Sequence, residues 1–365
     1  MMLRMLRIIS ISWACLWGVL ASLAHAAPDI AVSATETPAP SGRWDGSRSG
    51  PAARQGAKIA IISEDLRNGG VLGVTVGVRE AAAIIGWHTR IYDAAGTFDG
   101  RAKAMQNALT SQPDGVIIVG ADAKTLEPQL TQFAQRDVPV VGWHVAPKAG
   151  TMSGHPIAIN VSTDPLEVAR LTATAAVGNV HGRAGVVIFT DSGFEIATAK
   201  AEAMAAIVRA CTECRLLEVR DIAIAKVAET VPGVTRQLLA THGMNWTHAL
   251  AINDIYFDYA VPELIKAGRD NTNISLVSAG DGSAAAFLRI RAGTFQTATV
   301  AEPLNLQGWQ LVDELNRLLS GEAVTGYIIP AQLVTAETLG IDGDSRLLYD
   351  PDNGYREIYR LIWRR

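Results

Sequence analysis

From residue 58 onward, short and almost continuously apolar runs alternate with amphipathic stretches of helical period. The apolar runs cover residues 58–63, 88–93, 115–119 and 138–142, and the helical stretches between them cover 71–86, 97–112 and 124–136. Strands that are buried on both faces have nearly continuous apolar sequences, and alternation with helices is typical of a parallel sheet covered on both sides. The pattern therefore predicts an α/β fold.

The alternation restarts after residues 155–161 and continues for a similar length. Its predicted strands are 184–190, 215–219, 249–252, 274–278 and 294–300, and its predicted helices include 165–180, 195–210, 227–241, 284–292 and 304–320. Two series of this kind fit two lobes better than one core. In the tail, Ile358, Leu361 and Ile362 fall near one face of a helix, so we expect the tail to pack on one lobe.

The N-terminal sequence has the features of an export signal. Residues 1–26 combine Arg4 and Arg7, an apolar stretch over 8–23 and the small-x-small sequence Ala24-His25-Ala26. The apolar stretch is short for a membrane span, so we expect a cleaved signal peptide and a periplasmic mature protein. Residues 27–57 are rich in Pro, Ala, Ser, Thr and Gly and predict a flexible leader, in which Trp44 has no evident role.

Once Cys15 leaves with the signal, Cys211 and Cys214 remain in C-x-x-C spacing. A local structural disulfide is the leading interpretation in an oxidising compartment, and a redox pair is the alternative. A thioredoxin-like pair precedes a helix, whereas here the predicted helix comes before the cysteines. That order favours the structural disulfide.

Net charge and motifs exclude several function classes. The formal charge of −4 becomes 30 minus 36, or −6, without the signal, so we expect no attraction to nucleic acid. The turn after the first predicted strand lacks G-x-G-x-x-G, and the chain has no Walker loop, H-E-x-x-H or G-x-S-x-G. We therefore expect no catalytic activity, no cofactor and no metal.

Polar and aromatic side chains follow several predicted strands, where open α/β sheets bind ligands. Carboxylates and amides can bracket vicinal hydroxyls, and an aromatic ring can cover the apolar face of a sugar. This pattern suits a neutral polyhydroxylated ligand. The candidates for ligand binding are Asn68, Trp143, His144, Asp191, Phe194, Asn253, Asp254, Asp281 and Glu302.

Each candidate also has a structural interpretation. Asp254 can cap the helix that follows it, and Asp281 in Gly-Asp-Gly can form a turn. Trp143 and Phe194 can be core residues, and His144 can hydrogen-bond within the core. Of the pair Asn253 and Asp254, the first is favoured as the ligand contact and the second as the cap.

Several motifs together resemble the periplasmic sugar-binding proteins of ABC transporters, of the ribose-binding type. They are Ile252-Asn-Asp-Ile255, Ser278-Ala-Gly-Asp-Gly282 and Ala298-Thr-Val-Ala-Glu302, with 114–119 and 138–141 upstream. The resemblance implies the type I periplasmic binding protein fold, in which two Rossmann-like lobes joined by a three-segment hinge close on a ligand. It implies a first lobe of 58–161 plus 303–330, a second lobe of 162–302 plus 331–365, and crossings near Val161, Glu302 and Pro330.

The resemblance matches Asn253, Asp281 and Glu302 to ligand contacts of the family, and Asn68 to a contact from the first lobe. The sequence also departs from the family. Trp143-His144 stands where an Asp-Arg pair is common, Lys200 takes the place of an expected arginine, and Pro262 predicts a kinked or split helix.

The resemblance implies a monomeric solute-binding protein that captures a small sugar or polyol and delivers it to an ABC transporter permease. A periplasmic sensor for a chemoreceptor or histidine kinase and an exported hydrolase remain alternatives. A repressor is disfavoured because an export signal stands where a DNA-binding headpiece would be needed. The number of carboxylates among the candidates leaves a cationic amine open as the ligand.

Overall fold

The computed structural model describes residues 43–178, 183–341 and 347–364, which contain two lobes built on six-stranded sheets. The first sheet has the strand order β2-β1-β3-β4-β6-β5, and all neighbours are parallel except β5 and β6. Its strands are β1 (Lys58–Ser63), β2 (His88–Asp93), β3 (Gly115–Val119), β4 (Val140–Trp143), β5 (Gly150–Thr151) and β6 (Ile157–Val161).

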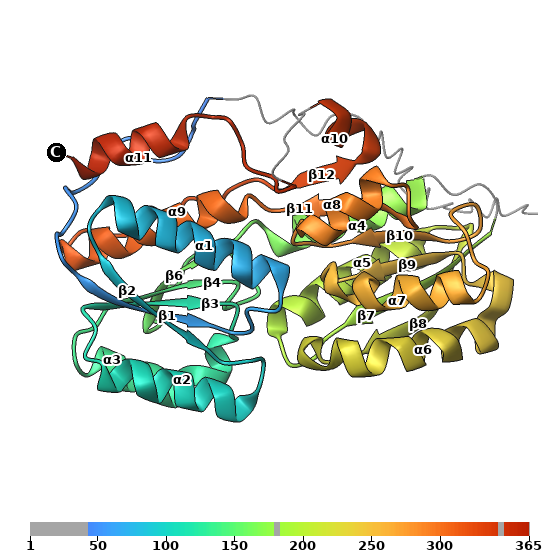
Figure 1. Ribbon diagram of the computed structural model, residues 1–365, viewed down its shortest axis with the longest axis horizontal. Helices are drawn as coiled ribbons and strands as arrows, with labels where there is room; N and C mark the ends of the chain where they lie inside the picture. The colour runs from blue at the N-terminus through green and yellow to red at the C-terminus, as the bar shows by residue number, and fades with distance from the viewer. Residues whose placement is uncertain (1–42, 179–182, 342–346, 365) are drawn as a thin grey trace, which may run out of the picture. The chain divides into compact units, whose positions relative to one another are not determined.

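Helices cover both faces of the first sheet, with a separate apolar core cluster on each face (Figure 1). One face carries α1 (Gly69–Ile84) and α9 (Leu304–Leu319). The other carries α2 (Phe98–Thr110), the short helix η1 (Ala123–Leu126) and α3 (Glu127–Ala134). The almost uninterrupted burial of β1 and β3 explains why their sequences are continuously apolar.

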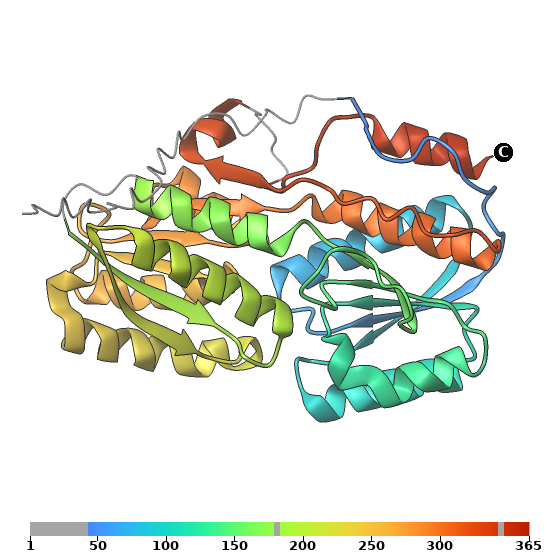
Figure 2. The same cartoon turned by 180° about the vertical axis from the view of Figure 1, so that it is seen from behind.

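The second sheet has the order β12-β11-β10-β9-β7-β8 and is parallel except for the pair β11 and β12. Helices α4 and α5 pack together, as do α6 and α7, while α8 lies against β11 (Figure 2). The strands are β7 (Ala184–Thr190), β8 (Cys214–Asp221), β9 (His248–Ala251), β10 (Ser275–Ser278), β11 (Gln296–Ala301) and β12 (Gln332–Thr335). The helices are α4 (Pro165–Gly178), α5 (Glu195–Ala210), η2 (Ile224–Lys226), α6 (Val227–His242), η3 (Gly243–Asn245), α7 (Ile255–Lys266), α8 (Ala284–Arg291) and α10 (Ala336–Ile341). Pro262 lies inside α7, which is not split at that point, contrary to one part of the expectation.

The chain passes between the lobes after β6, after β11 and between α9 and β12. It then returns to the first lobe through α11 (Tyr355–Trp363), which lies along α9 (Figures 1 and 2). The expectation that residues 331–365 belong together to the second lobe is therefore wrong for this helix. The buried face of α11 is mostly aromatic. It consists of Tyr355, Tyr359 and Trp363 together with Ile362, whereas Leu361 is 57% exposed.

Residues 43–57 are part of the folded body, although the whole of 27–57 was expected to be a flexible leader. The side chain of Trp44 is 2% exposed and packs against the rings of Tyr327 and Tyr359. Further along the segment, the backbone N–H of Ala53 donates to the carbonyl of Trp363 at 2.9 Å. The sequence did not predict this packing, because the segment is rich in Pro, Ala, Ser, Thr and Gly and has no helical or strand period. The expected signal peptide, residues 1–26, lies outside the described residues.

Cys211 and Cys214 are joined by a disulfide, the pairing favoured from their spacing. Cys211 follows the last residue of α5 and Cys214 begins β8, so the bond spans the turn between these two elements. Within the described parts of the chain, the helices are all too short or too polar to cross a membrane.

Candidate functional site

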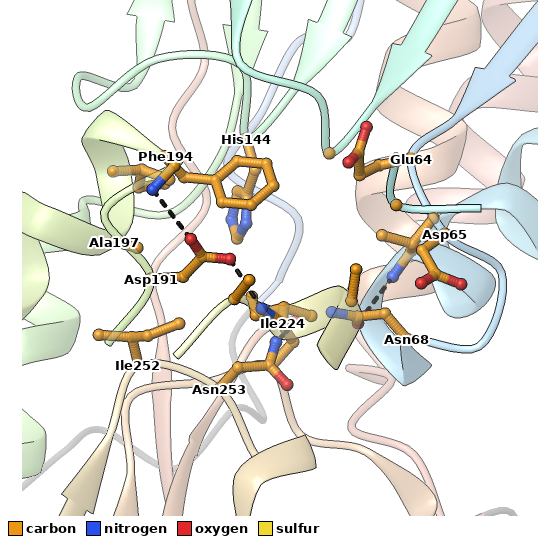
Figure 3. Close-up of a pocket in the computed structure, with 18 of the residues that line it drawn as sticks. Glu64, Asp65, Asn68, His144, Asp191, Phe194, Ala197, Ile224, Ile252 and Asn253 are labelled. Carbon is orange, nitrogen blue, oxygen red and sulfur yellow. Dashed lines mark hydrogen bonds between the residues drawn. The ribbon is translucent and has the colours of Figure 1, made fainter. Parts of the chain in front are cut away.

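A cavity of about 200 Å³ opens between side chains of both lobes. This space is at least ten times what a buried water requires, so the cavity has room for a small molecule. Side chains from the ends of β1 and β4 line it from the first lobe, and side chains that follow β7 and β9 line it from the second (Figure 3). The carboxyl ends of the parallel strands therefore converge here, as in other open α/β sheets.

The first-lobe wall begins directly after β1. Asn68 caps helix α1, because its Oδ1 accepts hydrogen bonds from the backbone N–H groups of Gly70 at 2.8 Å and Val71 at 3.4 Å. Glu64 also lines the cavity, and both of its carboxylate oxygens lie 2.8 Å from Nε of Arg101 on α2. Burial raises the pKa of Glu64 to about 7, against the opposing effect of Arg101.

Trp143 and His144 form the floor of the first-lobe side. Their rings stack with centroids 3.7 Å apart, and Trp143 Nε1 donates to Oε1 of Gln307 on α9 at 2.9 Å. His144 Nε2 lies 3.0 Å from Oε1 of Glu302, which follows β11. Although burial opposes it, the proximity of His144 and Lys200 holds the pKa of Glu302 well below its usual range. Glu302 lies behind His144 rather than among the cavity-lining residues.

The second-lobe wall is built at the end of β7 and the start of α5. Asp191 Oδ1 accepts from the N–H of Gly193 at 2.9 Å, and its Oδ2 accepts from the N–H of Ile224 at 2.8 Å (Figure 3). Burial raises the pKa of Asp191. Phe194 lies at the N-terminus of α5, and Lys200, six residues further on, donates to the carbonyl of Ala279 at 3.0 Å.

Asn253 and Asp281 form the remaining part of the second-lobe wall. Asn253 Nδ2 donates to Asp281 Oδ2 at 2.7 Å, while its Oδ1 accepts from the N–H of Ile255 at the start of α7. Burial raises the pKa of Asp281 to about 6, although the proximity of His144 and Lys200 opposes the shift. Asn253 therefore both contacts a buried carboxylate and caps a helix.

Asp254 is not among the cavity-lining residues. It stands at the N-cap position of α7 but its side chain makes no capping hydrogen bond, so the expectation that it caps this helix is wrong. Its Oδ2 accepts from the N–H groups of Gly282 and Ser283, each at 2.9 Å. Its Oδ1 accepts from Gln296 Nε2 and from the Thr299 hydroxyl. Asp254 thereby fixes the loop between β10 and α8, which carries Asp281.

The structure gathers most of the nine candidate side chains at one cavity. The seven that line it are Asn68, Trp143, His144, Asp191, Phe194, Asn253 and Asp281, whereas Asp254 and Glu302 support the wall from behind. Sequence reasoning missed Glu64, Asp65 and Arg101. The first two directly follow β1, so the strand-end rule applied to Asn68 could have found them. Arg101 is on α2 and its sequence context gives no comparable signal.

His144, Asp281 and Glu302 could offer three metal ligands, because one ligand atom from each lies within 4.8 Å of the others. The ammonium group of Lys200, however, lies 3.9 Å from Glu302 Oε1, and His144 bonds to the same carboxylate. Lys200 thus already supplies positive charge to the cluster. The arrangement is that of a buried charge network.

The two lobes touch at the rim of the cavity. Lys124 Nζ from the first lobe lies 2.9 Å from Glu195 Oε1 of the second, and both side chains are largely exposed. Phe194 lies beneath the guanidinium of Arg101, whose carbon is 5.8 Å from the ring centroid. The cavity is therefore walled from both sides in this structure.

Solved structures with the same architecture come from proteins that differ widely in sequence. A Caulobacter myo-inositol binding protein bound to myo-inositol shares 19% identity at a TM-score of 0.68, covering 80% of this chain and 96% of that one. An Agrobacterium vitis solute binding protein with bound allitol shares 18% identity at a TM-score of 0.66, covering 79% and 98%. One from Mycobacterium smegmatis with bound glycerol shares 18% at 0.71, covering 81% and 100%.

A comparison with curated protein sequences finds no match. The sequence model of the periplasmic binding protein domain, in contrast, matches residues 59–323, which is most of the chain and nearly all of both lobes. The solved structures support the same fold, because they superimpose on a chain with two lobes, each built on a mostly parallel six-stranded sheet. The chain belongs to the periplasmic binding protein domain family and has its type I fold.

Proposed function

We propose that this protein is an extracytoplasmic solute-binding protein that captures a small sugar or polyol between its lobes and delivers it to an ABC transporter permease. The observation that carries the proposal is the cavity itself, which has carboxylates, two amides and two aromatic side chains on walls from both lobes. Such groups can bind hydroxyls and cover an apolar sugar face. The similar structures that hold myo-inositol, allitol and glycerol support the same ligand class.

Ligand capture would shift an open–closed equilibrium. A ligand that touches Asn68 and Trp143 on one wall and Asn253 and Asp191 on the other gains its full set of contacts only when the lobes are together. The ligand therefore favours the closed state by its differential affinity. A permease would distinguish loaded protein by the closed arrangement of the lobe surfaces.

Binding rather than catalysis is the proposed activity. The cavity lining among the described residues includes no serine, threonine or cysteine, so a hydrolase would have to use the carboxylates of the cavity as nucleophile and acid. Turnover of a sugar by the purified protein would contradict this proposal and favour an exported hydrolase. A periplasmic sensor would use the same cavity, and capture of a receptor rather than a permease by the loaded protein would identify it.

A thermal-shift panel of pentoses, hexoses and polyols tests the proposed ligand class, because a ligand that binds only the folded protein raises Tm by mass action. We expect at least one sugar or polyol to raise Tm, and the rise to increase with ligand concentration. Asn253→Ala provides a site-specific check, since it should abolish the shift. A panel in which no polyhydroxylated compound changes Tm would contradict the proposal.

A further inference from the structure

The basic side chains of the cavity already have acidic partners. Arg101 is 2.8 Å from both carboxylate oxygens of Glu64. His144 is 3.0 Å from Glu302, and Lys200 is 3.9 Å from the same carboxylate. His144 and Lys200 therefore act first on Glu302, and at longer range they offset only part of the effect of burial on Asp281.

Two carboxylates of the cavity remain without such a partner. Asp65 is paired with Arg67 at 2.7 Å on the solvent side. For Asp191 and Asp281, in contrast, no nitrogen of a lysine, arginine or histidine in 43–178, 183–341 or 347–364 lies within 4.0 Å of the carboxylate oxygens. The cavity therefore carries more negative than positive charge.

Asp281 is the less well compensated of the two. Asp191 accepts two backbone hydrogen bonds, one on each oxygen, which stabilise its ionised form. Asp281 is 4% exposed, and its side chain receives a hydrogen bond only from the neutral amide of Asn253 among the described residues. Burial raises its pKa, although the proximity of His144 and Lys200 opposes the shift. A buried charge of this kind is costly unless it is paired.

We infer that the ligand is a polyhydroxylated molecule with one protonated amine, such as an amino sugar or an aminopolyol, and that Asp281 is the counterion of its ammonium group. This inference rests on the proposed function and specifies the substrate class of the same cavity. A neutral hydroxyl can donate to Asp281 but leaves its charge uncompensated. An ammonium group donates a hydrogen bond to the carboxylate and also neutralises its charge, and such charge-assisted hydrogen bonds are stronger than those between neutral groups.

Matched pairs of probes test the inference by isothermal titration calorimetry at pH 7.5 and constant ionic strength. The pairs are D-glucosamine with D-glucose and 1-amino-1-deoxy-D-sorbitol with D-sorbitol, and n-propylamine serves as an amine without hydroxyls. We expect the amine of at least one pair to bind about ten- to a hundredfold more tightly than its neutral partner, the range for a hydrogen bond to a charged group. Propylamine should bind more weakly than either aminated polyol.

The variant Asp281→Asn removes the charge and preserves the shape of the side chain. It should reduce the preference for the amine to less than about threefold while leaving the neutral partner bound, a change that loss of folding would not produce. Asp65→Asn is the matched control, because Asp65 also lines the cavity but has Arg67 as its counterion. This control should keep the preference.

The outcomes separate the inference from the proposed function. A neutral sugar that binds as tightly as its amine overturns the inference and leaves the proposed function intact. If propylamine binds as tightly as the aminated polyols, the hydroxyl groups do not contribute to binding. The proposed sugar or polyol ligand is then wrong, while the role of Asp281 as counterion stands. If Asp281→Asn retains the full preference for the amine, or if no amine of the panel binds, the assignment of Asp281 is overturned.

Discussion

Asp122 of the first lobe accepts a hydrogen bond from the backbone N–H of Glu195 in the second lobe, with 2.8 Å between Oδ2 and the nitrogen. The other oxygen accepts from the N–H of Lys124 and caps η1 in its own lobe at 3.0 Å. Phe194, at the N-cap position of α5, has no side chain that can cap the helix. One carboxylate therefore caps helices in both lobes, and α5 receives its cap from across the cavity.

We predict that Asp122→Ala weakens ligand binding by about fivefold, because a lost N-cap costs about 1 kcal/mol and this cap exists only when the lobes are together. Hydrogen exchange measured by NMR provides a readout that needs no ligand. The amide of Glu195 should be protected in the unmodified protein and should lose that protection in the variant.

Asp164→Ala is the matched control for this cap. Asp164 caps α4 within the second lobe by accepting from the N–H groups of Leu166 and Glu167. Its loss should lower Tm without changing exchange at Glu195 or ligand affinity. Equal protection of the Glu195 amide with and without the Asp122 carboxylate would show that the bond does not contribute to closure.

Gly70 is a second residue at which the lobes meet. A Cβ added there would lie 2.6 Å from Cγ and 2.9 Å from Cβ of Asp281, which belongs to the opposite lobe. We therefore predict that Gly70→Ala prevents full closure and weakens ligand binding by at least tenfold, because real atoms cannot approach so closely. Ligand titration and the radius of gyration of ligand-saturated protein, from small-angle X-ray scattering, would measure both effects.

Gly73→Ala on the same helix is its control. The added Cβ would lie 2.7 Å from Cδ1 of Leu304, which belongs to the core of the same lobe. This change should lower Tm and leave closure intact. If Gly70→Ala binds ligand normally, the close approach to Asp281 is not needed in the loaded state.

The strand-end rule predicted much of the candidate site because parallel strands carry their ends to a common edge. It placed Asn68, Asp191 and Asn253 at the cavity without information on side-chain contacts. It also included Asp254, although this residue directly follows Asn253 and points to the opposite side of the same loop. Only tertiary structure shows that the partners of Asp254 are Gly282 and Ser283, which are distant in sequence.

The parts of the fold that the sequence did not predict depend on long-range packing. The βα alternation predicts both lobes because each helix and strand has a local periodicity. Residues 43–57 have no such periodicity and are ordered by contacts with α9 and α11, as shown by the bond from Arg54 N–H to Asn316 Oδ1 at 3.0 Å. The aromatic face of α11 was likewise misassigned because Tyr355, Tyr359 and Trp363 combine apolar rings with polar atoms.

Stability of the ligand-free protein should fall as the pH rises from 5 to 8. The pKa of Glu64 is raised by burial from 4.5 to about 7 and that of Asp281 from 3.8 to about 6. Such groups bind protons more tightly in the folded state, so their contribution is complete below the unfolded-state pKa and is lost through the folded-state pKa. The loss from Glu64 is at most ~3 kcal/mol by the usual conversion of a pKa shift.

Glu64→Gln should therefore reduce the fall in Tm between pH 5 and 8, measured by differential scanning calorimetry. Glu80→Gln is the control because the pKa of Glu80 is lowered. Burial raises it, but hydrogen bonds from Asn305 and Arg356 outweigh that effect. A carboxyl group with a lowered pKa stabilises the folded protein at all pH values above its ordinary pKa of 4.5, and this contribution is lost only as the pH falls below that value. An unchanged slope in Glu64→Gln would mean that Glu64 is ionised throughout this range.

Trp44→Ala should destabilise the protein by about 3–5 kcal/mol, the usual cost of removing a buried large aromatic side chain. The ring of Trp44 is 5.1 Å from that of Tyr327 and 5.4 Å from that of Tyr359, and its Nε1 donates to the carbonyl of Ser47. Its loss would leave a cavity between residues 43–57, α11 and the segment that carries Tyr327. Chemical denaturation would measure the change in the free energy of unfolding.

Leu361→Ala, on the exposed face of α11, is the matched control and should change that free energy by less than about 0.5 kcal/mol. Ligand affinity should be unchanged in both variants at a temperature where each is folded, because neither side chain lines the cavity. A Trp44→Ala protein as stable as the control would show that residues 43–57 do not pack as described. Normal stability combined with weaker ligand binding would instead mean that residues 43–57 influence closure of the lobes. The effect would be indirect, because neither Trp44 nor Leu361 lines the cavity.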